Sequence, residues 1–146
     1  MVKMLVGYPA CGKSTYARKM AAKGFAVLSS DSIREELFGT EDEQANCNLV
    51  FKILYERMGK LLENNVDVIL DATNIKKRDR KFALDFINKY NVPVEACVFT
   101  TPIEVCKERN SKRDRQVPDY VYTRMERQFT YPTLDEGFVT ITEVSI

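Results

Sequence analysis

Residues 7–14 read G-Y-P-A-C-G-K-S, and this stretch decides the fold. It matches in full the phosphate-binding loop pattern G-x-x-x-x-G-K-[ST], and Thr15 follows it. The apolar run Val2–Val6 predicts a short buried strand before the loop, and strong helix formers follow from Tyr16 to Ala22. Strand, glycine loop and helix in this order are the context that the pattern requires. The sequence therefore predicts a loop that holds nucleotide phosphates.

The loop can bind phosphate through its main chain and through two side chains. Gly7 and Gly12 allow backbone angles that a Cβ would obstruct, so several N–H groups can point at phosphate oxygens. We expect Lys13 to reach the β- and γ-phosphates and the Ser14 hydroxyl to bind Mg²⁺. The alternative is a glycine turn without a ligand. The expected nucleotide contacts are Gly7, Ala10, Cys11, Gly12, Lys13, Ser14 and Thr15, with Cys11 as a small loop filler rather than a redox group.

Composition narrows the classes of function. The 146 residues predict one domain, residues 1–146, and the net charge of +1 means that any nucleic-acid binding must come from local patches. The four cysteines have no C-x-x-C spacing and the chain has no histidine, which argues against zinc and predicts reduced thiols in a cytoplasmic protein. No apolar run has membrane-spanning length, and Met1 leads straight into a strand, so we expect neither a membrane segment nor a signal peptide. Without histidine, a general base must be a carboxylate, lysine, tyrosine or thiol.

Strand-like and helix-like segments alternate along the chain. The expected strands are Val2–Val6, Phe25–Leu28, Val66–Leu70, Val92–Phe99 and Phe138–Ile141. The expected helices are Lys13–Ala22, Ser32–Phe38, Ala45–Asn64, Lys76–Tyr90, Ile103–Asn110 and Pro118–Phe129. The acidic segment Glu41–Glu43 connects the second helix to the third. In the helix Lys76–Tyr90 we expect Phe82, Leu84, Phe86 and Ile87 to point inward. The alternation predicts the α/β class, with a five-stranded parallel sheet flanked by helices. Ligands then lie at the carboxyl ends of the strands, which places the phosphate loop, Ser29–Asp31 and Asp71–Asn74 along one edge.

Asp31 and Arg34 are three residues apart at the start of a helix, so both can face the ligand edge. A carboxylate there can orient an acceptor hydroxyl and accept its proton, as the catalytic-loop aspartate does in protein kinases. Arg34 suits a neighbouring anion. The alternative is that Ser30 or Asp31 only caps the helix while Arg34 pairs with one of the two glutamates that follow it.

Asp71 ends a strand that resembles a magnesium-binding acidic strand, so it can hold Mg²⁺ directly or through water. Thr73 and Asn74 can donate hydrogen bonds to phosphate or sugar groups. The alternative for this segment is an Asx or Thr turn that only takes the chain out of the strand.

Two basic runs remain. Lys107–Arg115 lies between two expected helices, where a lid belongs, and Arg109 and Arg113 are four apart and are expected to share a helix face. Lid arginines can clamp phosphates and offset charge in the transition state. The run Lys76–Lys81 opens a helix, where cations oppose the dipole. An anionic partner is one interpretation of that run, and surface solvation is the preferred one for most of its residues.

Together these segments resemble the 5′-hydroxyl polynucleotide kinase domain of phage and bacterial nucleic-acid repair enzymes. The resemblance covers most of the chain and rests on G-Y-P-A-C-G-K-S-T at 7–15, S-S-D-S-I-R at 29–34, D-A-T-N at 71–74 and V-C-K-E-R-N-S-K-R-D-R-Q-V at 105–117. Many unrelated activities share the phosphate loop, whereas the Asp-x-x-Arg element and the Glu-Arg-Asn-x-x-Arg lid at these intervals are more specific.

The resemblance implies a P-loop kinase fold with a small lid at about residues 107–117. It also implies that Lys13 and Ser14 bind the nucleotide and magnesium. Asp31 would be the general base, and Arg34, with Thr73 nearby, would bind the acceptor's 3′-phosphate. Arg109 and Arg113 would contact ATP from the lid, with Arg115 beside them. Relatives commonly carry a phosphatase or ligase module. None follows the last strand here, which implies a stand-alone kinase or a relative with a changed acceptor.

The leading hypothesis is therefore an ATP- and Mg²⁺-dependent kinase that phosphorylates the 5′-hydroxyl end of RNA or DNA. The same chemistry on a small molecule, such as a sugar acid, a nucleoside or a cofactor precursor, is the first alternative. A non-catalytic nucleotide switch is the second, although a switch has no need of Asp31. Few aromatic residues look exposed enough to stack on bases, with Tyr8, Tyr120 and Tyr122 as the candidates. The sequence separates neither RNA from DNA nor one oligomeric state from another.

Overall fold

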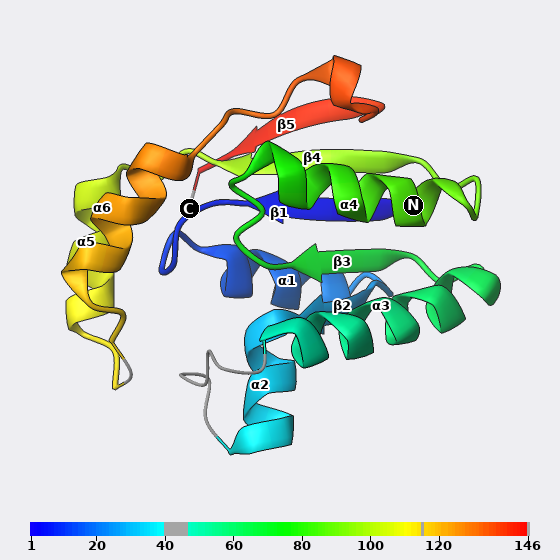
Figure 1. Cartoon of the computed structure of the whole chain (residues 1–146). Coiled ribbons are helices and arrows are strands. Elements are labelled where there is room, and N and C mark those ends of the chain that lie inside the picture. The colour runs from blue at the N-terminus through cyan, green and yellow to red at the C-terminus, as the bar shows by residue number, and fades with distance from the viewer. Residues whose placement is uncertain (40–46, 115, 146) are drawn as a thin grey trace.

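The computed structural model describes residues 1–39, 47–114 and 116–145, and its centre is a parallel sheet (Figure 1). The strands are β1 (Val2–Val6), β2 (Ala26–Ser29), β3 (Val68–Asp71), β4 (Val94–Phe99) and β5 (Thr140–Val144). Their order across the sheet is β2-β3-β1-β4-β5, and all neighbouring pairs are parallel. The α/β class and the five-stranded parallel sheet predicted from the sequence are confirmed.

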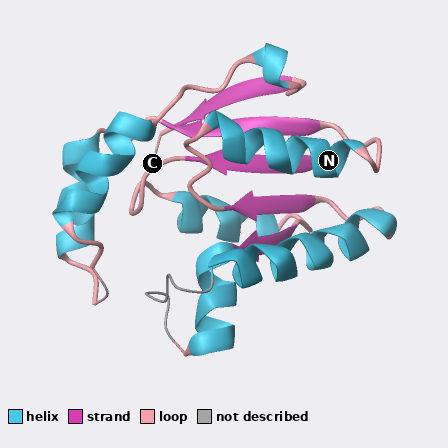
Figure 2. Ribbon diagram, viewed as in Figure 1, coloured by secondary structure: helices cyan, strands magenta, loops and turns pink. Residues whose placement is uncertain are grey.

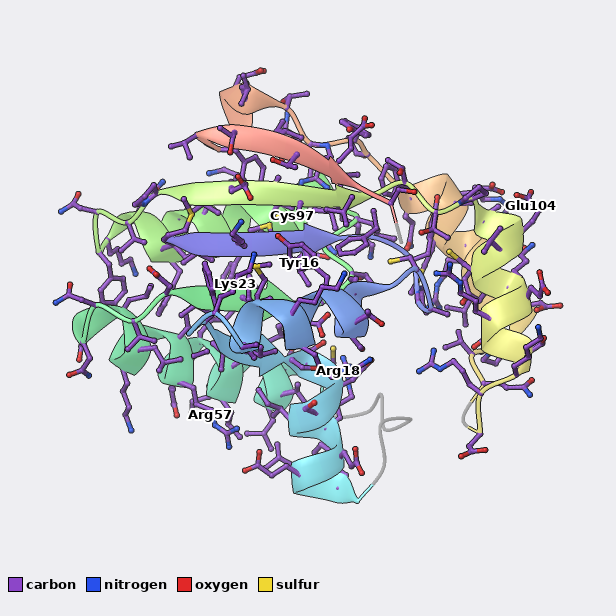
Figure 3. All side chains as sticks on the ribbon, turned by 180° about the vertical axis from the view of Figure 1, so that it is seen from behind. Tyr16, Arg18, Lys23, Arg57, Cys97 and Glu104 are labelled. Carbon is purple, nitrogen blue, oxygen red and sulfur yellow. The ribbon has the colours of Figure 1, made fainter. Side chains whose placement is uncertain are left out.

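Helices cover both faces of the sheet. They are α1 (Lys13–Ala21), α2 (Ser30–Phe38), α3 (Cys47–Glu63), α4 (Lys77–Asn88), α5 (Ile103–Ser111) and α6 (Asp119–Gln128), and a 3₁₀ turn, η1, spans Leu134–Glu136. Figure 2 shows α3 and α4 in front of the sheet, and the reverse view in Figure 3 brings α1 to the front. The pair α5 and α6 stands beyond the carboxyl ends of the strands (Figure 1). None of the described helices is long and apolar enough to cross a membrane.

The strands are buried on both faces because each contributes to two hydrophobic cores in alternation. Along β1, Val2 and Met4 belong to the core beneath α3 and α4, whereas Leu5 belongs to the core beneath α1. The same alternation separates Val68 and Leu70 from Ile69 in β3. Continuous apolar strands of this kind are typical of parallel sheets covered by helices.

Several boundaries differ from those expected. The strand predicted from Val66 begins at Val68, because Asn65 turns the chain at a φ of 59° and the Val66 N–H bonds back to the Leu61 carbonyl. The strand predicted at Phe138–Ile141 runs from Thr140 to Val144, and Phe138 is instead a buried core residue before it. The other bounds match or differ by one or two residues. Glu41–Glu43 and Ala45 lie outside the described residues.

Two predictions about α4 are wrong. Phe82 was expected to point inward, but its side chain is 64% exposed. Arg80 belongs to a run assigned mainly to surface solvation, yet it is fully buried. Its Nε donates to Glu136 Oε1 at 2.8 Å, its Nη2 to Glu136 Oε2 at 3.3 Å and its Nη1 to the Asn74 carbonyl at 2.9 Å. The sequence separates Arg80 from Glu136 by 56 residues, so no local pattern could reveal the pair.

We predict that Arg80→Ala lowers the free energy of unfolding by about 3–5 kcal/mol, because it leaves the buried Glu136 carboxylate without its partner. Urea denaturation measures the change. Lys81→Ala is the matched control, since the Lys81–Asp85 pair on the same helix is exposed and is expected to contribute less than about 1 kcal/mol. Equal small losses for both variants would contradict the structural role of Arg80.

Candidate functional site

The phosphate loop between β1 and α1 owes its shape to two glycines that act differently. Gly12 has a φ of 110°, in the left-handed region that a side chain disfavours. Gly7 is needed for space rather than for backbone angle, which corrects the expectation from sequence. A Cβ at Gly7 would lie 2.6 Å from Cys11 Sγ and 3.1 Å from Phe99 Cβ. Ala10 has a left-handed φ of 62° without being glycine, so the loop holds a locally unfavourable conformation.

Three long-range hydrogen bonds hold the loop in place. The Gly7 N–H donates to the Thr73 carbonyl at 3.0 Å. The Thr101 hydroxyl donates to the Cys11 carbonyl at 2.9 Å, and the Tyr122 hydroxyl donates to the Pro9 carbonyl at 2.7 Å. These bonds come from the loop after β3, the segment after β4 and α6, so three distant parts of the chain fix the phosphate loop.

Tyr122 is fully buried, so it cannot stack on a base as the sequence suggested. Of the other two candidates, Tyr8 is half-buried and its ring centroid lies 5.5 Å from that of Phe129, whereas Tyr120 is 68% exposed. The position of Tyr122 explains its burial, because its ring packs in the core beneath α1 while its hydroxyl reaches the loop.

Lys13 lies across the loop that it follows. Its Nζ donates to the Gly7 carbonyl at 3.0 Å and to the Tyr8 carbonyl at 2.8 Å, and it lies 3.8 Å from Cys11 Sγ. Burial raises the pKa of the Cys11 thiol, and the ammonium of Lys13 opposes that shift. The neutral thiol thus fills the inside of the loop, and the cation stays at the loop surface where phosphate oxygens can replace the carbonyls.

Two carboxylates stand near Lys13 at the same edge of the sheet. Ser29 and Asp71 are paired in the register of β2 and β3, so the residue before α2 lies beside the end of β3. Burial raises the pKa of the Asp71 carboxyl, Lys13 opposes the shift, and the Asp31 carboxylate adds to it. Both charges act on Asp71, so Lys13, Asp31 and Asp71 lie near one another at the strand ends.

Asp31 and Arg34 are ion-paired with each other. Arg34 Nη1 donates to Asp31 Oδ1 at 2.9 Å, and Arg34 Nη2 lies 3.5 Å from Cys47 Sγ on α3. The Arg34 side chain is 9% exposed and that of Asp31 is 50% exposed. The alternative pairings are wrong, because Glu36 bonds to Arg57 and the helix is capped by Ser29, whose Oγ accepts from the Ser32 N–H at 3.2 Å.

The Nε of Arg34 is buried and has no hydrogen-bond partner among the residues that the structure describes. A buried guanidinium donor without an acceptor is uncommon in a folded protein and costs free energy. The open side of Arg34 therefore favours an anionic or polar group of a ligand. Because Arg34 also holds Asp31, a ligand that binds Arg34 is brought next to an exposed carboxylate.

Two residues of the loop after β3, Asn74 and Thr73, have different roles. Asn74 has a φ of 48° and is buried, and its Nδ2 donates to the Leu5 carbonyl at 2.8 Å and more weakly to the Ala72 carbonyl at 3.4 Å. The amide nitrogen expected to bind substrate is thus committed to the main chain of β1. Thr73 is half-buried and lines an adjoining groove, so its hydroxyl remains the candidate ligand contact.

The lid arginines do not share a helix face as predicted, because α5 ends at Ser111 and Arg113 lies in the turn beyond it. Burial raises the pKa of the Cys106 thiol to about 11, and Lys13 and Arg109 both oppose that shift. Burial raises the pKa of Tyr122 to about 12, and the positive charge of Arg113 opposes that shift. Both arginines therefore lie close enough to affect the pKa of residues that adjoin the phosphate loop. Arg115 lies outside the described residues.

Asn110 gives the lid turn its shape. Its Nδ2 donates to the Val117 carbonyl at 2.7 Å, and the Val117 N–H donates back to its Oδ1 at 2.9 Å. This reciprocal pair closes the segment that carries Arg113. Sequence reasoning included Asn110 in the lid motif without a role, and it missed the roles of Tyr122 and Arg80 because their partners are distant in sequence.

The residues suggested for Mg²⁺ suit that ion in chemistry. Ser14 opens α1 with an exposed side chain, and Asp71 ends β3 beside Lys13. One hydroxyl and one carboxylate fit Mg²⁺, which binds a few protein oxygens and completes its shell with water and phosphate. The described residues contain no cluster of three or more acidic, cysteine or histidine side chains that would form an all-protein cage.

Comparison with known proteins adds a family and a fold group. Residues 2–132 match the family described as an AAA domain. The bifunctional polynucleotide phosphatase/kinase of Schizosaccharomyces pombe is 24% identical over 98% of this chain and 33% of its own length. The L-seryl-tRNA(Sec) kinase of Methanococcus maripaludis is 26% identical over 90% of this chain and 53% of its own. The chain thus spans about a third to a half of these curated relatives.

Solved structures show the same fold. A chain of the Pnkp1/Rnl/Hen1 RNA repair complex matches with a TM-score of 0.78 and 24% identity, over 87% of this chain and 43% of that one. A gluconokinase from Sinorhizobium meliloti matches with a TM-score of 0.67 and 16% identity, over 99% of this chain and 82% of that one. The P-loop kinase fold implied by the sequence is confirmed.

We predict that Gly7→Ala lowers the free energy of unfolding by about 1–3 kcal/mol and weakens binding of a fluorescent ATP analogue, because the new Cβ overlaps Cys11 Sγ. The double variant Gly7→Ala/Cys11→Ala removes the sulfur and is expected to recover part of both losses, with Cys11→Ala alone as the matched control. Thermal denaturation and nucleotide titration measure the effects. No recovery in the double variant would contradict the steric account of Gly7.

Proposed function

The chain belongs to the AAA-domain family that its residues 2–132 match, and from this premise we propose that it is an ATP-dependent kinase acting on the 5′-hydroxyl end of RNA or DNA. The observation that carries the proposal is the Asp31–Arg34 pair. The half-exposed Asp31 carboxylate and the buried Arg34 guanidinium lie at the same edge of the sheet as the phosphate loop, and within the described part of the chain the Arg34 Nε has no partner. This arrangement suits an alcohol that lies next to an anionic group.

The donor half of the proposed site is the phosphate loop. Its N–H groups and the N-terminus of α1 attract the β- and γ-phosphates of ATP, and Lys13 exchanges its carbonyl partners for phosphate oxygens. Ser14 and Asp71 would hold Mg²⁺, which neutralises developing charge on the phosphates. Arg109 and Arg113 approach from α5 and the turn after it and contribute positive charge on the lid side.

The acceptor half is Asp31, Arg34 and Thr73. Asp31 orients the 5′-hydroxyl and accepts its proton, while the hydroxyl oxygen forms a bond to the γ-phosphorus. The bond from that phosphorus to the bridging oxygen breaks in line, and ADP leaves with the bonding electron pair. Arg34 binds the next phosphate of the acceptor through the free side of its guanidinium, and the Thr73 hydroxyl binds it from the opposite loop. Positioning and charge neutralisation supply most of the rate enhancement.

The choice of a nucleic-acid acceptor is supported by two relatives whose names refer to a polynucleotide and to a tRNA. Structural neighbours named as a gluconokinase and a sugar kinase share the fold. A small hydroxylated molecule is therefore the alternative acceptor. An anion next to the reacting hydroxyl separates nucleic acid from a neutral polyol, because the 5′ nucleotide of a nucleic acid carries a 3′-phosphate and a polyol carries no charge. A sugar acid carries a carboxylate, so the acceptor itself has to be compared.

Acceptor profiling with γ-labelled ATP tests the proposal. We expect label on 5′-hydroxyl oligonucleotides and on nucleoside 3′-monophosphates, and none on 5′-phosphorylated oligonucleotides or neutral polyols. A matched nucleoside without the 3′-phosphate is the control for the role of Arg34 and is expected to react much more slowly. Transfer to a polyol or sugar acid in preference to every 5′-hydroxyl nucleotide would overturn the assignment.

We predict that Asp31→Asn slows phosphoryl transfer by about 10²–10⁴-fold, the usual contribution of a general base, and leaves ATP affinity within a few-fold. The amide keeps the size of the side chain but cannot take the proton. Single-turnover kinetics and equilibrium nucleotide binding separate the two effects. Glu35→Gln, an exposed carboxylate on the same helix, is the matched control and should retain the wild-type rate. Near wild-type transfer by Asp31→Asn would remove Asp31 from the mechanism.

A further inference from the structure

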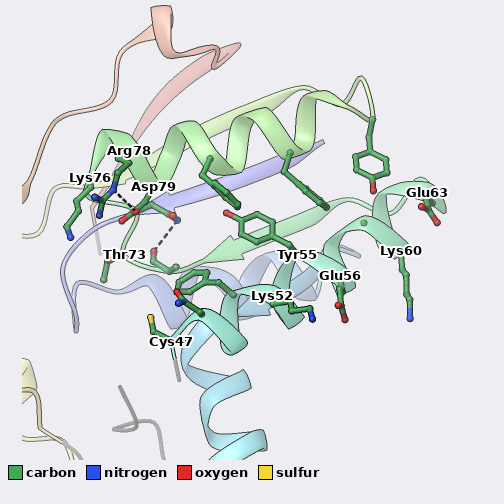
Figure 4. A pocket seen from close by; sticks show the side chains of 18 residues that line it. Cys47, Lys52, Tyr55, Glu56, Lys60, Glu63, Thr73, Lys76, Arg78 and Asp79 are labelled. Carbon is green, nitrogen blue, oxygen red and sulfur yellow. Dashed lines mark hydrogen bonds and ion pairs between the residues drawn. The ribbon is translucent and has the colours of Figure 1, made fainter. Parts of the chain in front are cut away.

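A groove of 1120 Å³ runs between α3 and α4 and opens at the loop that contains Thr73 (Figure 4). It extends along α3 from Cys47 to Glu63, which corresponds to about 24 Å of helix at 1.5 Å per residue. Its volume exceeds the range of about 300–1,000 Å³ that is typical of pockets for small ligands. The groove therefore continues from the proposed acceptor site and is larger than a single small acceptor requires.

Aromatic side chains line the middle of the groove. Tyr55 on α3 lies between two rings on α4, with its centroid 5.2 Å from that of Phe82 and 5.0 Å from that of Phe86. Tyr90 extends the series at 5.6 Å from Phe86. The Phe82 ring is 64% exposed although a buried position was expected from sequence. An exposed ring in a groove that is continuous with a nucleotide site offers a face on which a base can stack.

The charges along the groove are unequally distributed. Near Thr73 the lining contains two cations, Lys76 and Arg78, and one carboxylate, Asp79, which lies 3.9 Å from Arg78 (Figure 4). Figure 4 shows Lys52 beside Glu56 in the middle of the groove and Lys60 near Glu63 at the opposite end. The end next to the acceptor loop thus has an excess of cations, whereas the charges of the other lining residues balance.

The cations near Thr73 also lie at an electrostatically unfavourable place. Lys76 is the N-cap of α4 without a side-chain capping bond, and Arg78 lies in the first turn. The positive end of a helix dipole disfavours cations there, so their presence costs stability unless an anion offsets it. A polyanion at the mouth of the groove would supply that offset.

We propose that this groove binds the nucleotides downstream of the phosphorylated end, and that the preferred acceptor is single-stranded. The proposal rests on the proposed function. The phosphates that follow the 5′ nucleotide meet Lys76 and Arg78, and a base beyond them stacks on Phe82 and Tyr55. A single strand fits because its bases are free to stack on protein rings, whereas the bases of a duplex are already stacked and paired. Glu56 and Glu63 offset the lysines beside them, so the excess of positive charge serves only the first few nucleotides.

The test compares acceptors of one, two, four and six nucleotides with the same 5′ nucleotide. For the wild-type protein we expect KM to fall as the acceptor lengthens and to level off after the first few nucleotides, with little change in kcat. Phe82→Ala is expected to raise KM for the hexanucleotide at least about fivefold and to leave the nucleoside 3′-monophosphate unaffected, because only the longer acceptor reaches the ring. Phe82 is exposed, so this variant is expected to fold normally.

Two controls make the comparison specific. Leu134→Ala removes another exposed apolar side chain, on η1, and Lys19→Glu reverses an exposed charge on α1, on the opposite face of the sheet. Neither should alter the dependence of KM on length, whereas Arg78→Glu, at an exposed side chain, should weaken it and lower the dependence of oligonucleotide binding on salt concentration. Equal effects of Phe82→Ala on the shortest and longest acceptors, or no effect on either, would overturn the proposal.

Direct binding separates this inference from the proposed function. A single-stranded hexanucleotide with a 3′-fluorescein and a free 5′-hydroxyl is titrated with the protein in the absence of ATP, and its anisotropy is compared with that of the same strand in a duplex. Tighter binding of the single strand, weakened by Phe82→Ala, supports the groove even if no 5′-hydroxyl acceptor is phosphorylated. If Phe82→Ala instead changes the sedimentation coefficient and leaves oligonucleotide binding intact, the groove is a protein interface and the proposal fails.

Discussion

The hydrogen bond from the Gly7 N–H to the Thr73 carbonyl joins the two halves of the site, and the geometry of the whole edge depends on it. Gly7 begins the phosphate loop, and Thr73 belongs to the loop on the proposed acceptor side. Asn74 adds a second link through its bond to the Leu5 carbonyl on β1. Because β1 and β3 are neighbouring parallel strands, these bonds fix the offset between their two loops. The proposed donor and acceptor groups are therefore held at a fixed spacing by main-chain geometry.

The buried Arg80 extends this constraint into the rest of the protein. Its Nη1 holds the Asn74 carbonyl while its other nitrogens bind Glu136 on η1, near the end of the chain. A buried ion pair is costly to desolvate and is stable only when hydrogen bonds satisfy it, which these bonds do. The acceptor loop is thus supported from beneath, so its position does not depend on exposed side chains that solvent can displace.

The sequence predicted the fold and the arrangement of the candidate site at one edge of the sheet, because both follow from local patterns. Alternating apolar segments indicated the parallel sheet, and the strand ends placed the phosphate loop, Asp31 and Asp71 together. It did not predict Arg80–Glu136, Tyr122–Pro9 or the burial of Asn74, since each depends on a partner far along the chain. It also misplaced Phe82, because helical spacing alone does not show that the neighbouring helix stands apart at that turn and leaves the ring in a groove.

The central claim is that this site sends the γ-phosphate to a 5′-hydroxyl rather than to water. A single-turnover reaction with labelled ATP, excess protein and a 5′-hydroxyl oligonucleotide, followed by digestion to mononucleotides, measures that partition directly. We expect most of the label to be recovered in the 5′-monophosphate of the terminal nucleotide. Recovery of the label as inorganic phosphate, at a rate that the oligonucleotide does not change, would contradict it.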